Sequence, residues 1–214
     1  ATPDRVLEVS RHNLGALTNM ARYCGERGIR LLRISSDIIP LATHPGAAYA
    51  WREACATELD AAAQTIAEAG LRVSMHPGQY TVLNSPREDV VERAVAELIF
   101  HADVLDAVAA DFSSPIVLHV GGLYGDKGKA LDSFIRGFSL LPEQVTRRLV
   151  LENEERHFTV ADVLELSRKV RVTVLMDVFH HALSPAPGSM GEWLDRAGET
   201  WGGARGRQKI HYSQ

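Results

Sequence analysis

The stretch LRVSMHPGQY, residues 71–80, carries a short apolar run into a histidine, His76, and then breaks at Pro-Gly. Runs of the same kind, rich in Val, Ile and Leu, recur along the chain with helical patterns before and between them. They predict strands at residues 29–34, 71–75, 115–120, 148–152, 171–177 and 208–212. Strands this apolar are covered on both faces, as in a parallel α/β sheet, which leaves a doubly wound sheet or a (β/α)8 barrel.

Nearly all of these predicted strands carry a potential metal ligand at or just beyond the C-terminal end. The ligands are His76, His119, Glu152, Asp177 with His180, and His211, and the remaining run is followed nearby by His44. In a (β/α)8 barrel all the strand ends meet on one face, whereas a doubly wound sheet spreads them along an edge. A single histidine would be interpreted as a structural or loop residue, but the repetition favours a (β/α)8 barrel formed by one domain over residues 1–214.

The composition is that of a globular protein with one substantial core: 214 residues, 45% hydrophobic, with 17 Gly and 9 Pro. No run of about 18 apolar residues and no signal-like N-terminus occurs, so we expect a cytoplasmic protein without a membrane partner. Cys24 and Cys55 lack metal-type spacing and are predicted to be free thiols. A net charge of -4 argues mildly against a general nucleic-acid binder, so any DNA contact must be local.

Imidazole and carboxylate ligands without cysteine are typical of Zn, Mn or Fe in an open catalytic site. The candidate ligands exceed what one ion takes, and Glu152 can bridge two ions about 3.5–4 Å apart. Lys209 lies two residues before His211, so both side chains point into the barrel, where an ammonium beside metal ions is disfavoured. Lys209 therefore either reaches the solvent at the rim or is neutral or carbamylated, which would supply an anionic oxygen ligand.

Five segments resemble the motifs of the UV damage endonuclease family and span nearly the whole chain: HPGQY (76–80), LHVGGLYGDKGKA (118–130), LENEER (151–156), DVFHHALSP (177–185) and KIHYSQ (209–214). The resemblance implies a metal-dependent (β/α)8 barrel, similar in fold to endonuclease IV. It implies a DNA repair enzyme that nicks DNA immediately 5′ to ultraviolet photoproducts and some other lesions, leaving a 3′-hydroxyl and a 5′-phosphate. We expect a monomer, associated with the nucleoid, that acts on damaged double-stranded DNA with two or three divalent ions, Mn²⁺ being the expected metal.

The resemblance also implies a role for individual residues. One ion would be held by His76, His119 and Glu152, a second by Glu152, Asp177 and His211, and a third by His180. Glu152, Lys209 and His44 would be catalytic residues of the active site.

Two loops are expected to contact DNA. Gln79 and Tyr80 resemble the pair that inserts at the lesion; the alternative is that Tyr80 packs onto the following helix and Gln79 is merely solvated. The loop 121–129 offers backbone amides, Tyr124, Lys127 and Lys129 for phosphate contact. The alternative for this second loop is a solvated glycine-rich turn that opens a helix.

The chain departs from the family's pattern at both ends. The first strand, with a tyrosine and an asparagine of the DNA-probing site, is not present, and neither is the last strand, with a further carboxylate ligand. A histidine ligand of the third ion, expected after residue 214, is missing too. Because Ala1 stands where an initiator Met would, we expect a fragment whose barrel lacks the family's first and last strands. Two other functions stay open: a metal-dependent sugar isomerase of similar barrel type, and a non-catalytic binding barrel that takes up no metal.

Overall fold

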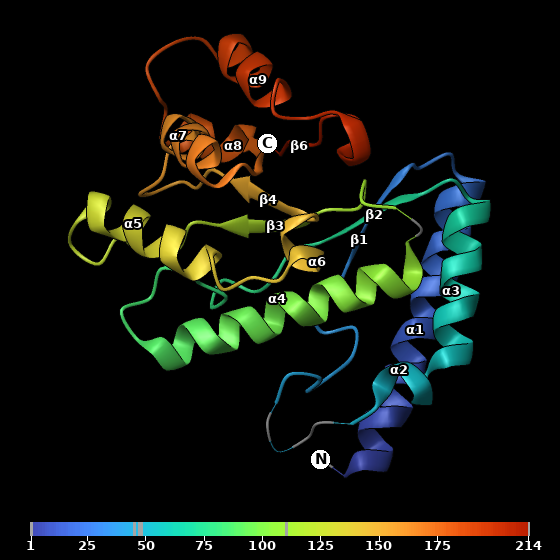
Figure 1. Cartoon of the computed structure of the whole chain (residues 1–214). Helices are drawn as coiled ribbons and strands as arrows, with labels where there is room; N and C mark the ends of the chain where they lie inside the picture. Colours follow the sequence, from blue (N-terminus) through green and yellow to red (C-terminus); the bar gives the residue numbers. More distant parts are fainter. Residues whose placement is uncertain (1, 45, 47–48, 110, 214) are drawn as a thin grey trace.

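Six parallel strands lie side by side in the order in which the chain reaches them (Figure 1). They are β1 (Leu31–Ile34), β2 (Arg72–Met75), β3 (Ile116–His119), β4 (Leu149–Glu152), β5 (Thr173–Asp177) and β6 (Ile210–His211). Within residues 2–44, 46, 49–109 and 111–213, which the computed structural model describes, no pairing joins β6 back to β1. The sheet is therefore a curled half-barrel that is open between its first and last strands. This confirms the predicted fold, a (β/α)8 barrel without the family's first and last strands.

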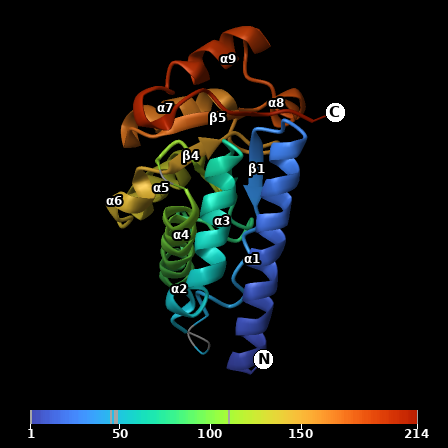
Figure 2. The same ribbon diagram turned by 90° about the vertical axis from the view of Figure 1, so that its right-hand side faces the viewer.

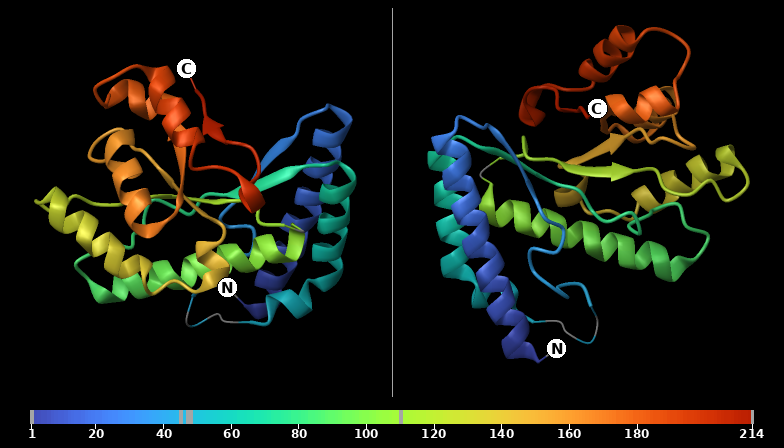
Figure 3. Two further views of the ribbon diagram at one scale, coloured as in Figure 1. Left: turned by 45° about the horizontal axis from the view of Figure 1, so that its top comes forward. Right: turned by 180° about the vertical axis from the view of Figure 1, so that it is seen from behind.

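Helices pack along the outside of this curled sheet (Figures 2 and 3). They are α1 (Pro3–Glu26), α2 (Trp51–Ala54), α3 (Ala56–Glu68), α4 (Glu88–Val108), α5 (Lys127–Phe138), α6 (Glu143–Thr146), α7 (Val160–Val170), α8 (Val178–Leu183) and α9 (Met190–Gly198), with a 3-10 turn at Gly203–Arg205. Helices α1 and α3 lie side by side, and α4 packs against β2 and β3. Each predicted strand is confirmed, although each is shorter than the apolar run suggested. Within the described residues, no helix is long and apolar enough to cross a membrane.

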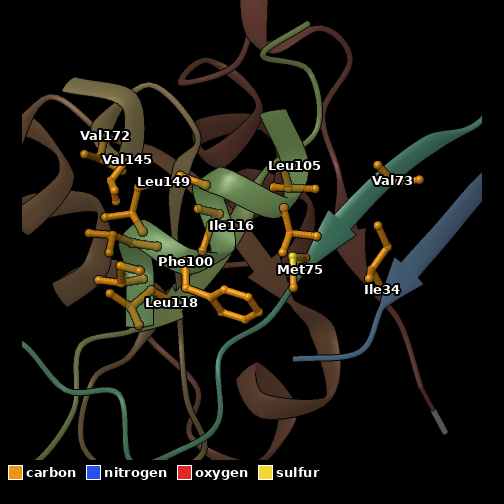
Figure 4. Close-up of a cluster of buried hydrophobic side chains, with 14 of the residues drawn as sticks. Ile34, Val73, Met75, Phe100, Leu105, Ile116, Leu118, Val145, Leu149 and Val172 are labelled. Atoms are coloured by element: carbon orange, nitrogen blue, oxygen red, sulfur yellow. The ribbon is translucent and has the colours of Figure 1, made fainter. Parts of the chain in front are cut away.

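Among the residues that the structure describes, buried apolar side chains form two separate clusters. The main core packs one set of strand residues, such as Ile116, Leu118 and Leu149, against the helices (Figure 4). The second cluster is small and consists of Val117, Val150 and Leu175, with Trp201 packed against it. Since successive residues of a strand point to opposite faces, the second cluster lies inside the curl of the sheet. It fills part of the barrel interior beneath the strand ends.

Candidate metal centre

The predicted ligands stand on the same inward face as the small interior cluster, one strand step further along. Two residues beyond Val117, Val150 and Leu175 come the side chains His119, Glu152 and Asp177. The register brings them to neighbouring positions, because His119 pairs with Glu152 and Asp177 pairs with His211. His76 directly follows β2, which pairs with β3. Strand alternation thus places a layer of imidazoles and carboxylates on the same face as the apolar floor and directly above it.

Glu152 lies at the centre of that layer and is 1% exposed. Its Oε2 lies 2.9 Å from His76 Nε2 and 3.3 Å from His119 Nε2, while its Oε1 lies 2.5 Å from His211 Nδ1. Asp177 joins on the second side, with Oδ2 3.9 Å from His211 Nδ1. Two ligand triads result, His76–His119–Glu152 and Glu152–Asp177–His211, and within each triad the ligand atoms lie within 4.8 Å of one another. One oxygen of Glu152 faces each triad, as a carboxylate that bridges two ions requires.

The protonation pattern of these residues suits a divalent cation. Nδ1 of His76 lies 3.1 Å from the Pro77 carbonyl oxygen and Nε2 lies 2.9 Å from Glu152 Oε2, so each ring nitrogen faces an acceptor and the ring proton can sit on either. In the tautomer with the proton on Nδ1, the lone pair of Nε2 points at the carboxylate, and a cation held between the two would remove their repulsion. Burial lowers the pKa of His119, which keeps this imidazole neutral and able to ligate.

The charge of Glu152 is also fixed by its surroundings. Burial alone raises the pKa of its carboxyl, but the hydrogen bonds from His211 and His76 and the nearby His119 outweigh burial and lower the pKa below its usual range. Glu152 is therefore an anion at neutral pH. An anionic carboxylate among imidazoles is the donor set expected for Mn, Zn or Fe in an open site rather than for a closed structural zinc site.

His180 lies beside the triads rather than within them. Its ring centroid is 5.6 Å from that of His119, and its Nδ1 lies 2.9 Å from the carbonyl oxygen of Asn153. Its Nε2 faces Glu155, with 3.7 Å between Nε2 and Oε2. Glu155 lies in the LENEER segment but had no predicted role. The role of His180 as a ligand of a third ion stays a prediction. Glu155 is the carboxylate that faces His180 there.

Lys209 lies in the interior rather than at the rim, which makes the rim interpretation wrong. It is 8% exposed, and its Nζ donates a hydrogen bond to Ser74 Oγ at 2.7 Å. Ser74 is the inward residue two positions before His76, just as Lys209 is two positions before His211. Burial, with a smaller contribution from the positive Arg72, lowers the pKa of Lys209 to about 8. The neutral form of the Lys209 amine is therefore populated more readily than that of a lysine on the protein surface.

The turn after His76 projects the predicted lesion-reading pair into solvent. Thr81 N donates to the Gly78 carbonyl oxygen at 2.9 Å, which closes a turn with Gln79 and Tyr80 at its centre. Gln79 is exposed, and Tyr80 is 83% exposed. The alternative that Tyr80 packs onto the following helix is therefore wrong.

The glycine-rich loop 121–129 is held by a buried asparagine. Gly121 has φ +111°, and a Cβ there would lie 2.4 Å from Asn84 Oδ1, so this position requires glycine. The Asn84 amide donates to the Gly122 carbonyl oxygen at 2.7 Å and accepts from Gly122 N at 3.2 Å. Tyr124, with φ +50° and half exposed, lies over Gly122. The loop thus presents Tyr124 from a fixed backbone.

The two lysines of this loop differ. Lys127 Nζ forms an ion pair with Asp162 Oδ2 at 2.8 Å, which ties the start of α5 to the start of α7. Lys129 is exposed, with its Nζ 3.9 Å from Asp126 Oδ2. Asp126 caps α5 by accepting from Lys129 N, so the loop does open a helix. Lys129 is the freer of the two cations for a phosphate contact.

His44 is not brought into either triad. It is exposed in the loop after β1, where its N donates to the Leu41 carbonyl oxygen at 3.0 Å and its Nδ1 accepts from Gly46 N at 3.1 Å. Its catalytic role stays a prediction. Residues that the sequence interpretation missed are the buried Ser74, Asn84 and Asn153; for Asn153, its place directly after the bridging Glu152 was the available signal.

A half-barrel of parallel strands with two ligand triads at its strand ends defines a TIM-barrel-like protein with a candidate dinuclear metal centre. The sequence pattern of the UV-endonuclease UvdE family matches residues 2–214. The chain belongs to this family, which confirms the resemblance found in its motifs.

Individual relatives agree with this assignment. A UV DNA damage endonuclease of Clostridium perfringens (strain 13 / Type A) is 37% identical over 213 residues, covering 99% of this chain and 52% of the relative. The chain thus spans about half the length of that relative. The crystal structure of SacUVDE has a TM-score of 0.89 and 38% identity, covering 94% of this chain and 69% of that one.

More distant structures share the fold alone. Endonuclease IV from Thermus thermophilus has a TM-score of 0.60 at 17% identity, covering 86% of this chain and 66% of that one. A D-psicose 3-epimerase from Clostridium cellulolyticum H10 has a TM-score of 0.64 at 17% identity, covering 86% of this chain and 65% of that one. The expected likeness to endonuclease IV is confirmed at the level of the fold.

Proposed function

We propose that this chain forms the metal-binding part of a DNA repair endonuclease that acts at ultraviolet damage. The reaction is hydrolysis of the phosphodiester immediately 5′ to a photoproduct or another lesion, which leaves a 3′-hydroxyl and a 5′-phosphate. The observation that carries the proposal is Glu152, which turns one oxygen to each of two ligand triads. Membership in the UvdE family supports the choice of substrate.

Two divalent ions, Mn²⁺ in this proposal, would be held by the triads His76–His119–Glu152 and Glu152–Asp177–His211. When bound there, such ions lower the pKa of a water to provide hydroxide and stabilise charge on the phosphate and on the departing 3′ oxygen. The role of the protein is to hold the ligands in this arrangement. Glu152 keeps the two sites adjacent, and the apolar cluster of Val117, Val150 and Leu175 fills the interior beneath the ligands.

Further groups would complete the active site. His180, with Glu155, would contribute to a third ion. Lys209, held in the interior by Ser74, would be neutral or carbamylated beside the ions. His44 would act from the loop after β1. A carbamylated lysine would be seen as an added CO₂ mass in the intact protein, and a plain amine together with an active Lys209→Met variant would contradict this role.

Damage recognition would come from the loops on the same face. The exposed ring of Tyr80 can stack where bases are pried apart, and Gln79 can hydrogen-bond to exposed base edges. Unstacking costs a few kcal/mol and is cheapest where damage has weakened pairing. Tyr124 and Lys129, and Lys127 if it leaves Asp162, would contact the phosphate backbone.

The test is incision of a duplex with a single ultraviolet photoproduct by the full-length protein, with Mn²⁺ and with a chelator. A single nick 5′ to the lesion, with a ligatable 3′-hydroxyl and only in the presence of metal, is expected. Incubation of the same protein with ketoses addresses the isomerase alternative. Sugar conversion without DNA incision would replace the proposal by that alternative.

A further inference from the structure

Asn153, the residue after the bridging carboxylate, forms an unusual pair of hydrogen bonds with a neighbouring strand end. Its side chain is fully buried. Its Nδ2 donates to the Asp177 carbonyl oxygen at 3.0 Å, and its Oδ1 accepts from Asp177 N at 2.8 Å. The backbone ladder between β4 and β5 ends at the pair Glu152–Leu175, one residue before Asn153 and two residues before Asp177. The amide of Asn153 therefore replaces strand pairing at the point where that pairing has stopped.

Asp177 is held at a third point as well. Its Oδ1 accepts from His180 N at 2.8 Å and so caps the short helix α8. Both backbone polar groups and one carboxylate oxygen are thus committed, and the other oxygen, Oδ2, is the one that faces His211 in the second triad. The conformation of Asp177 leaves this single oxygen directed at the metal position.

The backbone of Asn153 acts on a second candidate ligand. Its carbonyl oxygen accepts from His180 Nδ1 at 2.9 Å, which places the proton on Nδ1 and leaves Nε2 with a lone pair. One residue therefore fixes Asp177 through its side chain and the tautomer of His180 through its main chain. A substitution of the side chain separates these two effects, because the carbonyl oxygen is retained.

We propose that Asn153 is a positioning residue for the second ion, acting through Asp177; the inference rests on the metal centre proposed above. Partners that orient a metal ligand typically contribute about 10- to 100-fold to metal affinity. The first triad, His76–His119–Glu152, has no contact with the Asn153 side chain among the described hydrogen bonds. Loss of the amide should therefore weaken one site and spare the other.

The chain contains a matched control. Asn84 is equally buried and makes the same pair of hydrogen bonds with the backbone of Gly122, which is not a ligand. Asn84→Ala and Asn153→Ala remove identical chemistry from the interior. A role limited to holding the fold predicts the same behaviour for both variants.

The experiment is titration of the metal-free chain with Mn²⁺ by calorimetry, for the wild type and both variants, with urea unfolding and circular dichroism as checks of the fold. We expect the two Mn²⁺ sites of the triads to be present in the wild type and in Asn84→Ala. Asn153→Ala is expected to keep one of them unchanged and to bind the other about 10- to 100-fold more weakly. Both variants should unfold at lower urea concentration than the wild type.

Two results would overturn the inference: wild-type affinity at both sites in Asn153→Ala, or equal weakening of both sites in the two variants. A wild-type chain that binds no Mn²⁺ would instead overturn the metal centre itself, and the positioning role with it. If Asn153→Ala does not fold, Asn153→Ser, which keeps a small polar group, must show the same selective weakening, and unchanged binding in that variant counts against the inference.

Discussion

Replacing Glu152 by glutamine tests the bridge between the two triads with almost no change of shape. Each oxygen of Glu152 faces a different triad, at 2.9 Å from His76 Nε2 and 2.5 Å from His211 Nδ1. Glutamine offers one neutral oxygen, and its amide nitrogen cannot ligate a metal ion. Glu152→Gln is therefore expected to impair both sites together, in contrast to the loss of a ligand that serves one site.

The magnitude follows from the position of Glu152 in direct contact with both sites. Removing a residue that only orients a ligand costs about 10- to 100-fold in affinity, so loss of the shared ligand is expected to cost at least about 100-fold per ion, or about 2.8 kcal/mol each. In the metal-free protein, the expected loss in the free energy of unfolding is smaller than this loss of metal affinity. One charge-assisted hydrogen bond, about 1.5–3 kcal/mol, is lost, and part of that is offset because a charge is no longer buried.

The assay is Mn²⁺ titration of the metal-free chain, followed by incision by the full-length protein. Glu165→Gln provides the control, since it makes the same chemical change in an exposed ion pair with Lys169 on α7. We expect wild-type metal binding in Glu165→Gln and no tight site in Glu152→Gln, with helical circular dichroism retained in both. A Glu152→Gln chain that keeps one site at wild-type affinity would refute the bridging role.

His76→Ala is expected to lose the first ion and nicking activity while keeping the fold and the second ion; an unfolded variant, or undiminished metal and activity, would remove His76 from the site. Gln79→Ala combined with Tyr80→Ala in full-length protein should weaken binding to lesion-bearing duplex far more than to undamaged duplex, with metal content unchanged, and equal losses would make the pair a general DNA contact. Gly121→Ala is expected to destabilise by about 1–3 kcal/mol or more in urea unfolding, because φ is +111° and the new Cβ meets a buried amide. Gly15→Ala in α1, where nothing lies within 4 Å of the new Cβ, should stabilise the fold by about 0.5–1 kcal/mol. A Gly121→Ala variant more stable than Gly15→Ala would contradict the argument from strain.

Much of the site could be predicted because the information is local. A short apolar run predicts a strand, and the alternation of side chains along the strand then predicts which residue near its end points inward. His119 and Glu152 were found in this way, and their pairing in the register brings them together as expected. The predicted strand at 208–212 is reduced to Ile210–His211, since strand ends depend on pairing with a neighbour rather than on the run itself.

What could not be predicted depends on partners far apart in the sequence. Lys209 is held by Ser74, and nothing in the sequence around either residue predicts this contact. Lys127 looked like a free cation in a glycine-rich loop, but Asp162 on α7 neutralises it. Asn153 lies in the LENEER segment but has no role that the sequence predicts, because its two hydrogen bonds to Asp177 form only when β4 and β5 lie side by side. Pairings of this kind follow from the curled geometry of the sheet and not from any local pattern.

The most direct test of the dinuclear centre is anomalous diffraction at the manganese edge from crystals of the full-length protein grown with Mn²⁺. The structure predicts two peaks on either side of the Glu152 carboxylate, one among His76, His119 and Glu152 and the other among Glu152, Asp177 and His211. Their separation is expected to be about 3.5–4 Å, as in other two-metal sites. Peaks absent from both triads, or a single ion that leaves one oxygen of Glu152 without metal, would contradict the bridging role on which the proposed reaction depends.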